Sequence, residues 1–143
     1  TFSGWDKTFT SVTSNLTVIA QYTENAKASY TALNAAISQA DALTETDYTA
    51  TTWSTVQTAL TAAKAVDKNL YAESQSTVDA AATALTSAMN ALVKVYTVTF
   101  VDYNGTTIQS AKVASGQSAT APAQPSRDGY TFSGWDKAFS NVT

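Results

Sequence analysis

The chain contains no cysteine and no histidine among its 143 residues. It therefore lacks thiol nucleophiles, imidazole bases and the usual ligands of zinc, haem and iron–sulfur clusters. Serine and threonine are abundant, but no ordinary Ser-His-Asp triad can form without histidine. We expect no enzymatic activity, no catalytic or cofactor-binding residues, no cofactor and no metal. The absence of cysteine also fits proteins that Gram-positive bacteria secrete.

Charged residues are scarce as well. They make up 13% of the sequence, about half of the usual share for a soluble domain. The net charge is −3 and the eight basic residues are scattered, so we expect no nucleic-acid partner and no binding to anionic lipid. No apolar run reaches about 18 residues, which predicts no membrane insertion. A neutral surface rich in threonine and serine is typical of exposed extracellular stalks.

The remaining acids give no recognisable catalytic or metal-binding pattern. Glycoside hydrolysis needs two carboxylates across a cleft, whereas these lie at expected helix caps and exposed faces: Glu24, Asp41, Glu45, Asp47, Asp67, Glu73 and Asp79. The segment Asp102–Gly105 lacks the further oxygen ligands and the late glutamate of a calcium loop, so we interpret it as a hairpin turn. We interpret the Asn-x-Thr motifs at Asn15, Asn104 and Asn141 as incidental, and we expect no lysine–asparagine crosslink because the lysines are expected to be exposed.

A repeat is the most informative feature of the sequence. Residues Thr1–Lys7 recur without change as Thr131–Lys137, and the likeness continues to Thr13 and Thr143. Ten of these thirteen positions are identical at an offset of 130 residues. We expect a parent protein with a tandem period near that length, of which this chain, opening at Thr1 without methionine, is a fragment or a mature product.

The two copies continue differently, and this predicts an interface. After Thr13 the first copy runs on into Leu16–Tyr22, whose alternation predicts a half-buried strand. The second copy stops at Thr143, before that strand would begin. Each end is therefore expected to be part of one β unit. Four residues on one face of the strand are predicted to pair with a neighbouring copy: Leu16, Val18, Ala20 and Tyr22.

Helical periodicity governs residues 24–94. Three amphipathic helices are expected near residues 25–43, 51–68 and 74–92, each with one apolar stripe. The stripes are Tyr30, Leu33, Ile37 and Ala40, then Trp53, Val56, Leu60 and Ala63, then Val78, Ala81 or Ala82, Leu85, Met89 and Leu92. Short connections predict an antiparallel three-helix bundle. Tyr48 and Trp53 could stack on sugars, but the helical stripe favours core packing.

Residues 95–143 return to β character. Tyr96–Val101 alternates, and Asn104-Gly105 predicts a type I′ hairpin with Thr106–Val113 as the return strand. Gly116 and Asp128-Gly129 predict turns, and Pro122 and Pro125 predict extended chain. An aromatic group follows with Tyr130, Phe132 and Trp135. We interpret Phe132 and Trp135 as core residues and Gly134 as a turn residue, rather than as a sugar-stacking platform.

These β residues resemble a known family. Tyr96–Gly105, the two prolines, and Arg127–Asp136 with its Gly-Tyr-x-Phe-x-Gly-Trp core resemble the Listeria–Bacteroides (internalin B-type) repeat. Leu16–Tyr22 is similar to the usual end of that repeat. The resemblance implies a small β-grasp-like unit assembled from residues 95–143 and 1–23, in cell-surface proteins without a general catalytic role.

The middle of the chain resembles a second family. Tyr48–Trp53, Leu60–Val66, Val78–Ala81 and Leu85 are similar to the FIVAR module. This resemblance implies a three-helix bundle of the kind found in large Gram-positive surface proteins and some secreted carbohydrate-active enzymes. Neither family supplies ligand residues for this chain.

Together these features predict an α+β chain with three parts. Residues 1–23 would be the C-terminal part of a β repeat, 24–94 a FIVAR-like helical module, and 95–143 the N-terminal part of the next repeat. Three alternating helices would place the β parts at opposite ends. We expect a structural spacer or fibre-forming segment of an extracellular, cell-wall or surface-associated bacterial adhesin.

The expected partners are neighbouring copies, joined head to tail by donor-strand addition or by covalent repetition. Two alternatives stay open at this point. One is a module that binds a host protein or a glycan, and the other is an accessory domain of a secreted carbohydrate-active enzyme.

Overall fold

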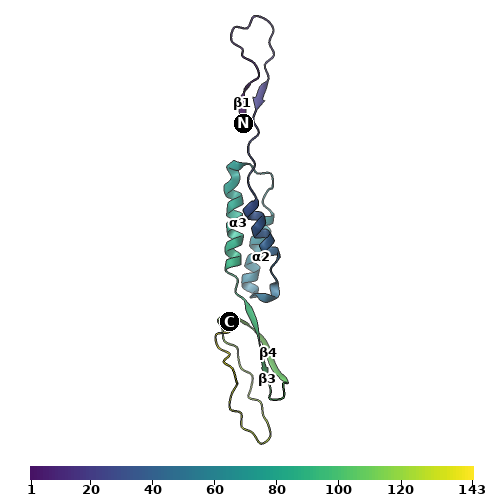
Figure 1. Cartoon of the computed structure of the whole chain (residues 1–143), viewed down its shortest axis with the longest axis vertical. Helices are drawn as coiled ribbons and strands as arrows, with labels where there is room; N and C mark the ends of the chain where they lie inside the picture. The colour runs from purple at the N-terminus through teal and green to yellow at the C-terminus, as the bar shows by residue number, and fades with distance from the viewer.

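A computed structural model describes all residues from Thr1 to Thr143. The molecule is elongated, with the helices in its middle and one small β part at each end (Figure 1). In chain order the elements are β1 (Phe2–Trp5), β2 (Ala20–Tyr22), α1 (Thr31–Asp41), η1 (Glu45–Asp47), α2 (Ala50–Lys64), η2 (Ala72–Ser74), α3 (Gln75–Asn90), β3 (Val95–Val101) and β4 (Thr107–Ala114). Three helices and two antiparallel two-stranded sheets agree with the expected α+β class.

The three helices share one hydrophobic core. Leu33, Val56, Val78 and Leu85 are its largest fully buried side chains. Alanines occupy many of the remaining buried positions: Ala28, Ala36, Ala40, Ala63, Ala82 and Ala88. Because alanine has only a methyl side chain, these positions allow the helices to approach closely. The predicted stripes point to this core, with Tyr30, Ile37 and Met89 half-buried at its border. Trp53 is the exception: it is half-buried outside this core and stacks on the Tyr48 ring, with centroids 6.2 Å apart.

The helices are shorter than the periodicity predicted. The first begins at Thr31 instead of near residue 25, because residues 26–28 are extended and pair with residues 70–72. The Ala28 amide donates to the Leu70 carbonyl at 3.0 Å, and the Ala72 amide donates to the Ala26 carbonyl at 2.9 Å. This backbone pairing competes with helix formation in the connecting segments.

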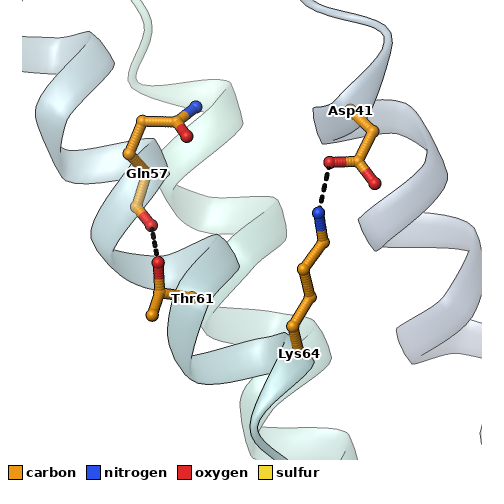
Figure 2. Close-up of polar contacts among 4 residues, drawn as sticks. All are labelled: Asp41, Gln57, Thr61 and Lys64. Atoms are coloured by element: carbon orange, nitrogen blue, oxygen red, sulfur yellow. Dashed lines mark hydrogen bonds and ion pairs between the residues drawn. The ribbon is translucent and has the colours of Figure 1, made fainter.

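Polar contacts between the helices lie on the surface. The Lys64 ammonium is 2.6 Å from an Asp41 carboxylate oxygen and joins α2 to α1, as Figure 2 shows. Both side chains are about half exposed, so the pair contributes on the order of 0.5 kcal/mol. The Thr61 hydroxyl donates to the Gln57 carbonyl one turn earlier at 2.8 Å. The shared apolar core, rather than such surface pairs, holds the helices together.

The helical part is tied to β3 at its C-terminal end. The Thr49 amide donates to the Val93 carbonyl at 2.9 Å, and the Lys112 ammonium donates to the Thr46 carbonyl at 2.7 Å. Only four residues separate the end of α3 from the start of β3. The hairpin therefore starts directly at the end of the helices.

The β3–β4 hairpin forms where it was predicted, but with a different turn. A type I′ turn requires positive φ at both central residues. Gly105 has φ +84°, whereas Asn104 does not have positive φ. The Asp102 amide donates to the Thr106 carbonyl at 2.8 Å, and the Gly105 amide donates to the Asp102 carbonyl at 2.9 Å. These bonds close a three-residue loop that ends on a left-handed glycine, which is the next most common hairpin connection.

The N-terminal strand is also shorter than predicted. Only Ala20–Tyr22 forms a strand, so Leu16 and Val18 lie outside it. This strand pairs antiparallel with β1 in the register Phe2 to Tyr22, Gly4 to Gln21 and Trp5 to Ala20, with a bulge between Phe2 and Gly4. With one neighbouring strand and no second layer, the segment has little to hold a longer strand in place.

Replacement of a core residue should unfold the helical part selectively. Leu85→Ala removes a fully buried side chain, so we expect a loss of about 2–5 kcal/mol in the free energy of unfolding. Urea denaturation followed by far-ultraviolet circular dichroism measures this loss. Thr83→Ala on the exposed face of the same helix is the matched control. An equal stability for both variants would contradict the assigned core.

Candidate strand-pairing site

The two copies of the repeated segment share an unusual backbone conformation at two corresponding positions. Gly4 and Gly134, which correspond at the repeat offset, have φ of +134° and +127°. Ser11 and Asn141 also correspond, and their φ values are +59° and +54°. These two are the only residues other than glycine with positive φ. The local sequence therefore sets the shape of the segment in both places.

The C-terminal copy packs against the hairpin. Phe100 and Val113 on the hairpin form a small core with Ala119, and Trp135 and Phe139 cover it. The Phe100 ring contacts the Trp135 ring at 4.9 Å and the Phe139 ring at 5.3 Å between centroids, both edge to face. Such aromatic pairs add to the free energy gained from burial. Trp135 thus packs on this core, as the sequence predicts, whereas Phe132 lies outside the core and contacts the Trp135 ring at 5.3 Å between centroids.

Backbone hydrogen bonds hold the same segment in place. The Ala119 amide donates to the Phe139 carbonyl, and the Gly116 amide donates to the Val142 carbonyl, each at 2.8 Å. The Val142 amide donates to the Gln117 carbonyl at 2.9 Å. Residues 139–142 are therefore fixed on the chain that follows β4.

The N-terminal copy has no hairpin to pack against. Phe2, Trp5, Phe9 and Val12 are 50%, 52%, 57% and 55% exposed. The three rings form edge-to-face pairs with one another and with Tyr22, for example between Trp5 and Phe9 at 6.3 Å. The corresponding residues of the second copy, Phe132, Trp135, Phe139 and Val142, are all more buried. The apolar side chains of the repeated segment are therefore partly covered in the C-terminal copy and exposed to solvent in the N-terminal copy.

The four residues predicted to pair with a neighbour lie on this open part. Tyr22 is 73% exposed and Leu16 is 41% exposed, whereas Val18 and Ala20 are half-buried. Additional bonds extend the β1–β2 pairing towards the turn. The Asp6 amide donates to the Ile19 carbonyl at 3.0 Å, and the Asp6 carboxylate accepts the Ile19 amide at 2.7 Å. The strand is thus held by one neighbour only.

The C-terminal unit has open strand edges instead. β3 pairs with β4 alone, and residues 131–136 form no strand and no backbone hydrogen bond. A groove of about 410 Å³ lies beside residues 130–136, with Val101–Tyr103 on its other wall. Arg127 lies at its rim, 4.1 Å from the Tyr103 ring and 3.7 Å from the Tyr130 ring. Sequence reasoning missed this stacking, because the three residues come together only through folding.

Three of the acidic side chains make structural contacts. Asp41 pairs with Lys64, Asp67 accepts the Asn69 amide, and Asp79 accepts the Gln75 side-chain amide. No three acids gather at a position that could hold a metal ion. None of the three helices combines the length and the apolar character that crossing a membrane requires.

Matched substitutions in the two copies should have unequal effects. Phe139→Ala removes a ring that packs on Phe100, so we expect the C-terminal unit to lose about 2–3 kcal/mol, below the full value for a completely buried ring. Phe9→Ala removes the corresponding exposed ring and should cost less than about 1 kcal/mol. Hydrogen exchange of the Ala119 and Val142 amides reports the first loss. Equal effects would contradict the difference in environment.

Comparison with known proteins shows that the C-terminal part is similar to a known family. Residues 96–142 match the model of the Listeria-Bacteroides repeat domain. Neither a curated protein nor a solved structure matches the chain. Repeats of this family occur in surface and extracellular proteins, and residues 96–142 carry the β3–β4 hairpin together with the segment that packs on it.

Proposed function

We propose that this chain is a structural spacer or fibre-forming segment of a bacterial surface adhesin, in which neighbouring copies complete each other's β units. One observation carries the proposal. The same thirteen-residue segment is packed on a hairpin at one end and largely exposed at the other. Packing against a neighbouring copy would cover the exposed face, on which Phe2, Trp5 and Phe9 are each about half exposed.

The proposal also assigns a fold to the helical part and to the two β parts. The helical part would be a FIVAR-type three-helix bundle, which its single alanine-rich core supports. The β parts would be halves of a β-grasp-like repeat, which the family match over residues 96–142 supports. The two hydrophobic cores share no residue. This separation supports division of the chain into residues 1–23, 24–94 and 95–143.

The arrangement suits a spacer mechanically. The two β parts lie at opposite ends of the helices, and so do the two termini (Figure 1). Helix α3 has 16 residues and spans about 24 Å. Each added copy would lengthen the molecule along one axis, with stability arising mainly within each unit and at the junctions. Such a rod would carry a binding domain away from the bacterial cell wall.

A binding role is the second candidate. The exposed Phe2, Trp5 and Tyr22 would suit a host protein or a glycan, because large exposed apolar patches often mark interaction sites. We favour a neighbouring copy as the partner, because the corresponding Phe132 and Trp135 are engaged within the chain itself. The open face is thus accounted for by the repeat without a foreign ligand.

Small-angle X-ray scattering tests the spacer. In a tandem protein two copies are joined at the repeat offset, so that residue 143 is followed by residue 14. We expect its maximum dimension to exceed that of the single chain by at least the length of the helical part, since the two termini lie at opposite ends of the helices (Figure 1). A single chain with Leu85→Ala, which loosens the helical core, should lose the rod-like scattering profile. A tandem protein as compact as one copy would contradict the spacer function.

A further inference from the structure

Arg127 is the only arginine of the chain, and two tyrosines hold its side chain in place. The guanidinium carbon lies 4.1 Å from the centre of the Tyr103 ring and 3.7 Å from the centre of the Tyr130 ring. A cation above an aromatic ring is attracted by the electrons of that ring. Tyr103 follows β3 and Tyr130 directly precedes the repeated segment. The contact thus joins the hairpin to residues 130–136 and positions the arginine between them.

The charge of Arg127 is not neutralised within the chain. The one ion pair of the molecule joins Lys64 to Asp41, so no carboxylate oxygen lies within 4.0 Å of the guanidinium nitrogens. Three of the lysines donate side-chain hydrogen bonds, whereas Arg127 donates none. A guanidinium has five N–H donors in one plane, and they match the two oxygens of a carboxylate or a phosphate group. Arg127 therefore offers a preformed and unused group for binding an anion.

Arg127 lies at the rim of a groove whose lining is largely polar. The groove has a volume of about 410 Å³, within the range of about 300–1,000 Å³ that is usual for small-molecule sites. Asp102 and Asp136 contribute carboxylates to the lining, and Ser126 and Ser133 contribute hydroxyl groups. An ionised carboxylate only accepts hydrogen bonds. A molecule that binds beside Arg127 must therefore bring donors for these two carboxylates.

The two carboxylates also restrict which anion can bind. A group with two negative charges, such as a phosphate monoester, would be repelled by Asp102 and Asp136 about twice as strongly as a single carboxylate. A small carboxylate without hydroxyl groups would leave these acceptors without donors, which costs free energy when water is displaced. A molecule with one carboxylate and several hydroxyl groups meets both requirements. Sugar acids have this composition.

We propose that this groove binds an acidic sugar, with Arg127 on its carboxylate and with Asp102 and Asp136 on its hydroxyl groups. The inference goes beyond the spacer function, because it gives the C-terminal unit a ligand of its own. Two parallel hydrogen bonds from the guanidinium would fix the orientation of the carboxylate. The Tyr103 and Tyr130 rings are 66% and 65% exposed, and their apolar surfaces would contact the C–H groups of the sugar ring.

Nuclear magnetic resonance of the full chain tests the site. Because the chain has one arginine, Arg127 gives its only arginine Nε–Hε signal. Titration with sodium glucuronate should move this signal and the backbone amide signals of Tyr103 and Tyr130. Glucose, which has no carboxylate, and acetate, which has no hydroxyl groups, should each bind at least about tenfold more weakly, because each lacks hydrogen bonds to charged groups. Inorganic phosphate should also bind more weakly than glucuronate.

Matched variants separate recognition from packing. Arg127→Lys keeps the charge but removes the planar fork, and it should weaken glucuronate binding at least about tenfold. Asp102→Asn keeps the arginine and both tyrosines, and it should weaken glucuronate binding several-fold without weakening acetate binding. Lys27→Gln is the control, because Lys27 also lies over a tyrosine, Tyr71, at 3.8 Å but belongs to the helical part. This variant should bind glucuronate as the original chain does.

Three results would overturn the proposal. They are binding of acetate or phosphate as tightly as glucuronate, unchanged glucuronate binding by Arg127→Lys, and signal changes confined to residues outside the groove. Slow hydrogen exchange of the Ala119 and Val142 amides reports whether the C-terminal unit of each variant is folded. If Arg127→Lys loses this protection, the comparison of glucuronate with acetate in Asp102→Asn decides. None of these results bears on the scattering of the tandem protein, which tests the spacer function separately.

Discussion

The helical core keeps the two β parts apart, and this separation determines how the molecule can be completed. A strand is stable when its backbone groups pair on both sides or reach solvent, and when its apolar face is covered. β2 has a neighbour on one side only, and β3 has a free edge at the far end of the molecule. Because the helices lie between them, neither end lies beside the other in one chain. Under the proposed function, a neighbouring copy supplies the missing partner.

The repeated segment shows how one sequence enters two environments. Its two copies share positive φ at Gly4 and Gly134 and at Ser11 and Asn141. The surroundings differ, because only the second copy follows a hairpin in the chain. Trp135 packs on Phe100, whereas Trp5 is half exposed. The burial of these side chains therefore depends on whether a hairpin lies beside the segment, whereas the positive φ values depend on the segment's own sequence.

In the helical part, the periodic pattern of apolar residues predicts the core positions but not the helix ends. The positions of Leu33, Val56 and Leu85 in the core follow from their spacing, because residues three or four apart share one helix face. The helix ends do not follow in the same way. Residues 26–28 pair with residues 70–72, and this long-range contact ends the first helix early. A pairing partner forty residues away leaves no local signal.

The sequence by itself determined the mixed class, the positions of the three helices and the hairpin, the repeat and the Listeria-Bacteroides likeness of the C-terminal part. These depend on local spacing, turn residues and motif identity. Only the tertiary structure decided the turn geometry at Asn104, the short extent of the strand at Ala20–Tyr22 and the stacking of Arg127. It also brought the edge of β3 beside residues 131–136. Such features arise from contacts between residues far apart in the chain, which no local pattern encodes.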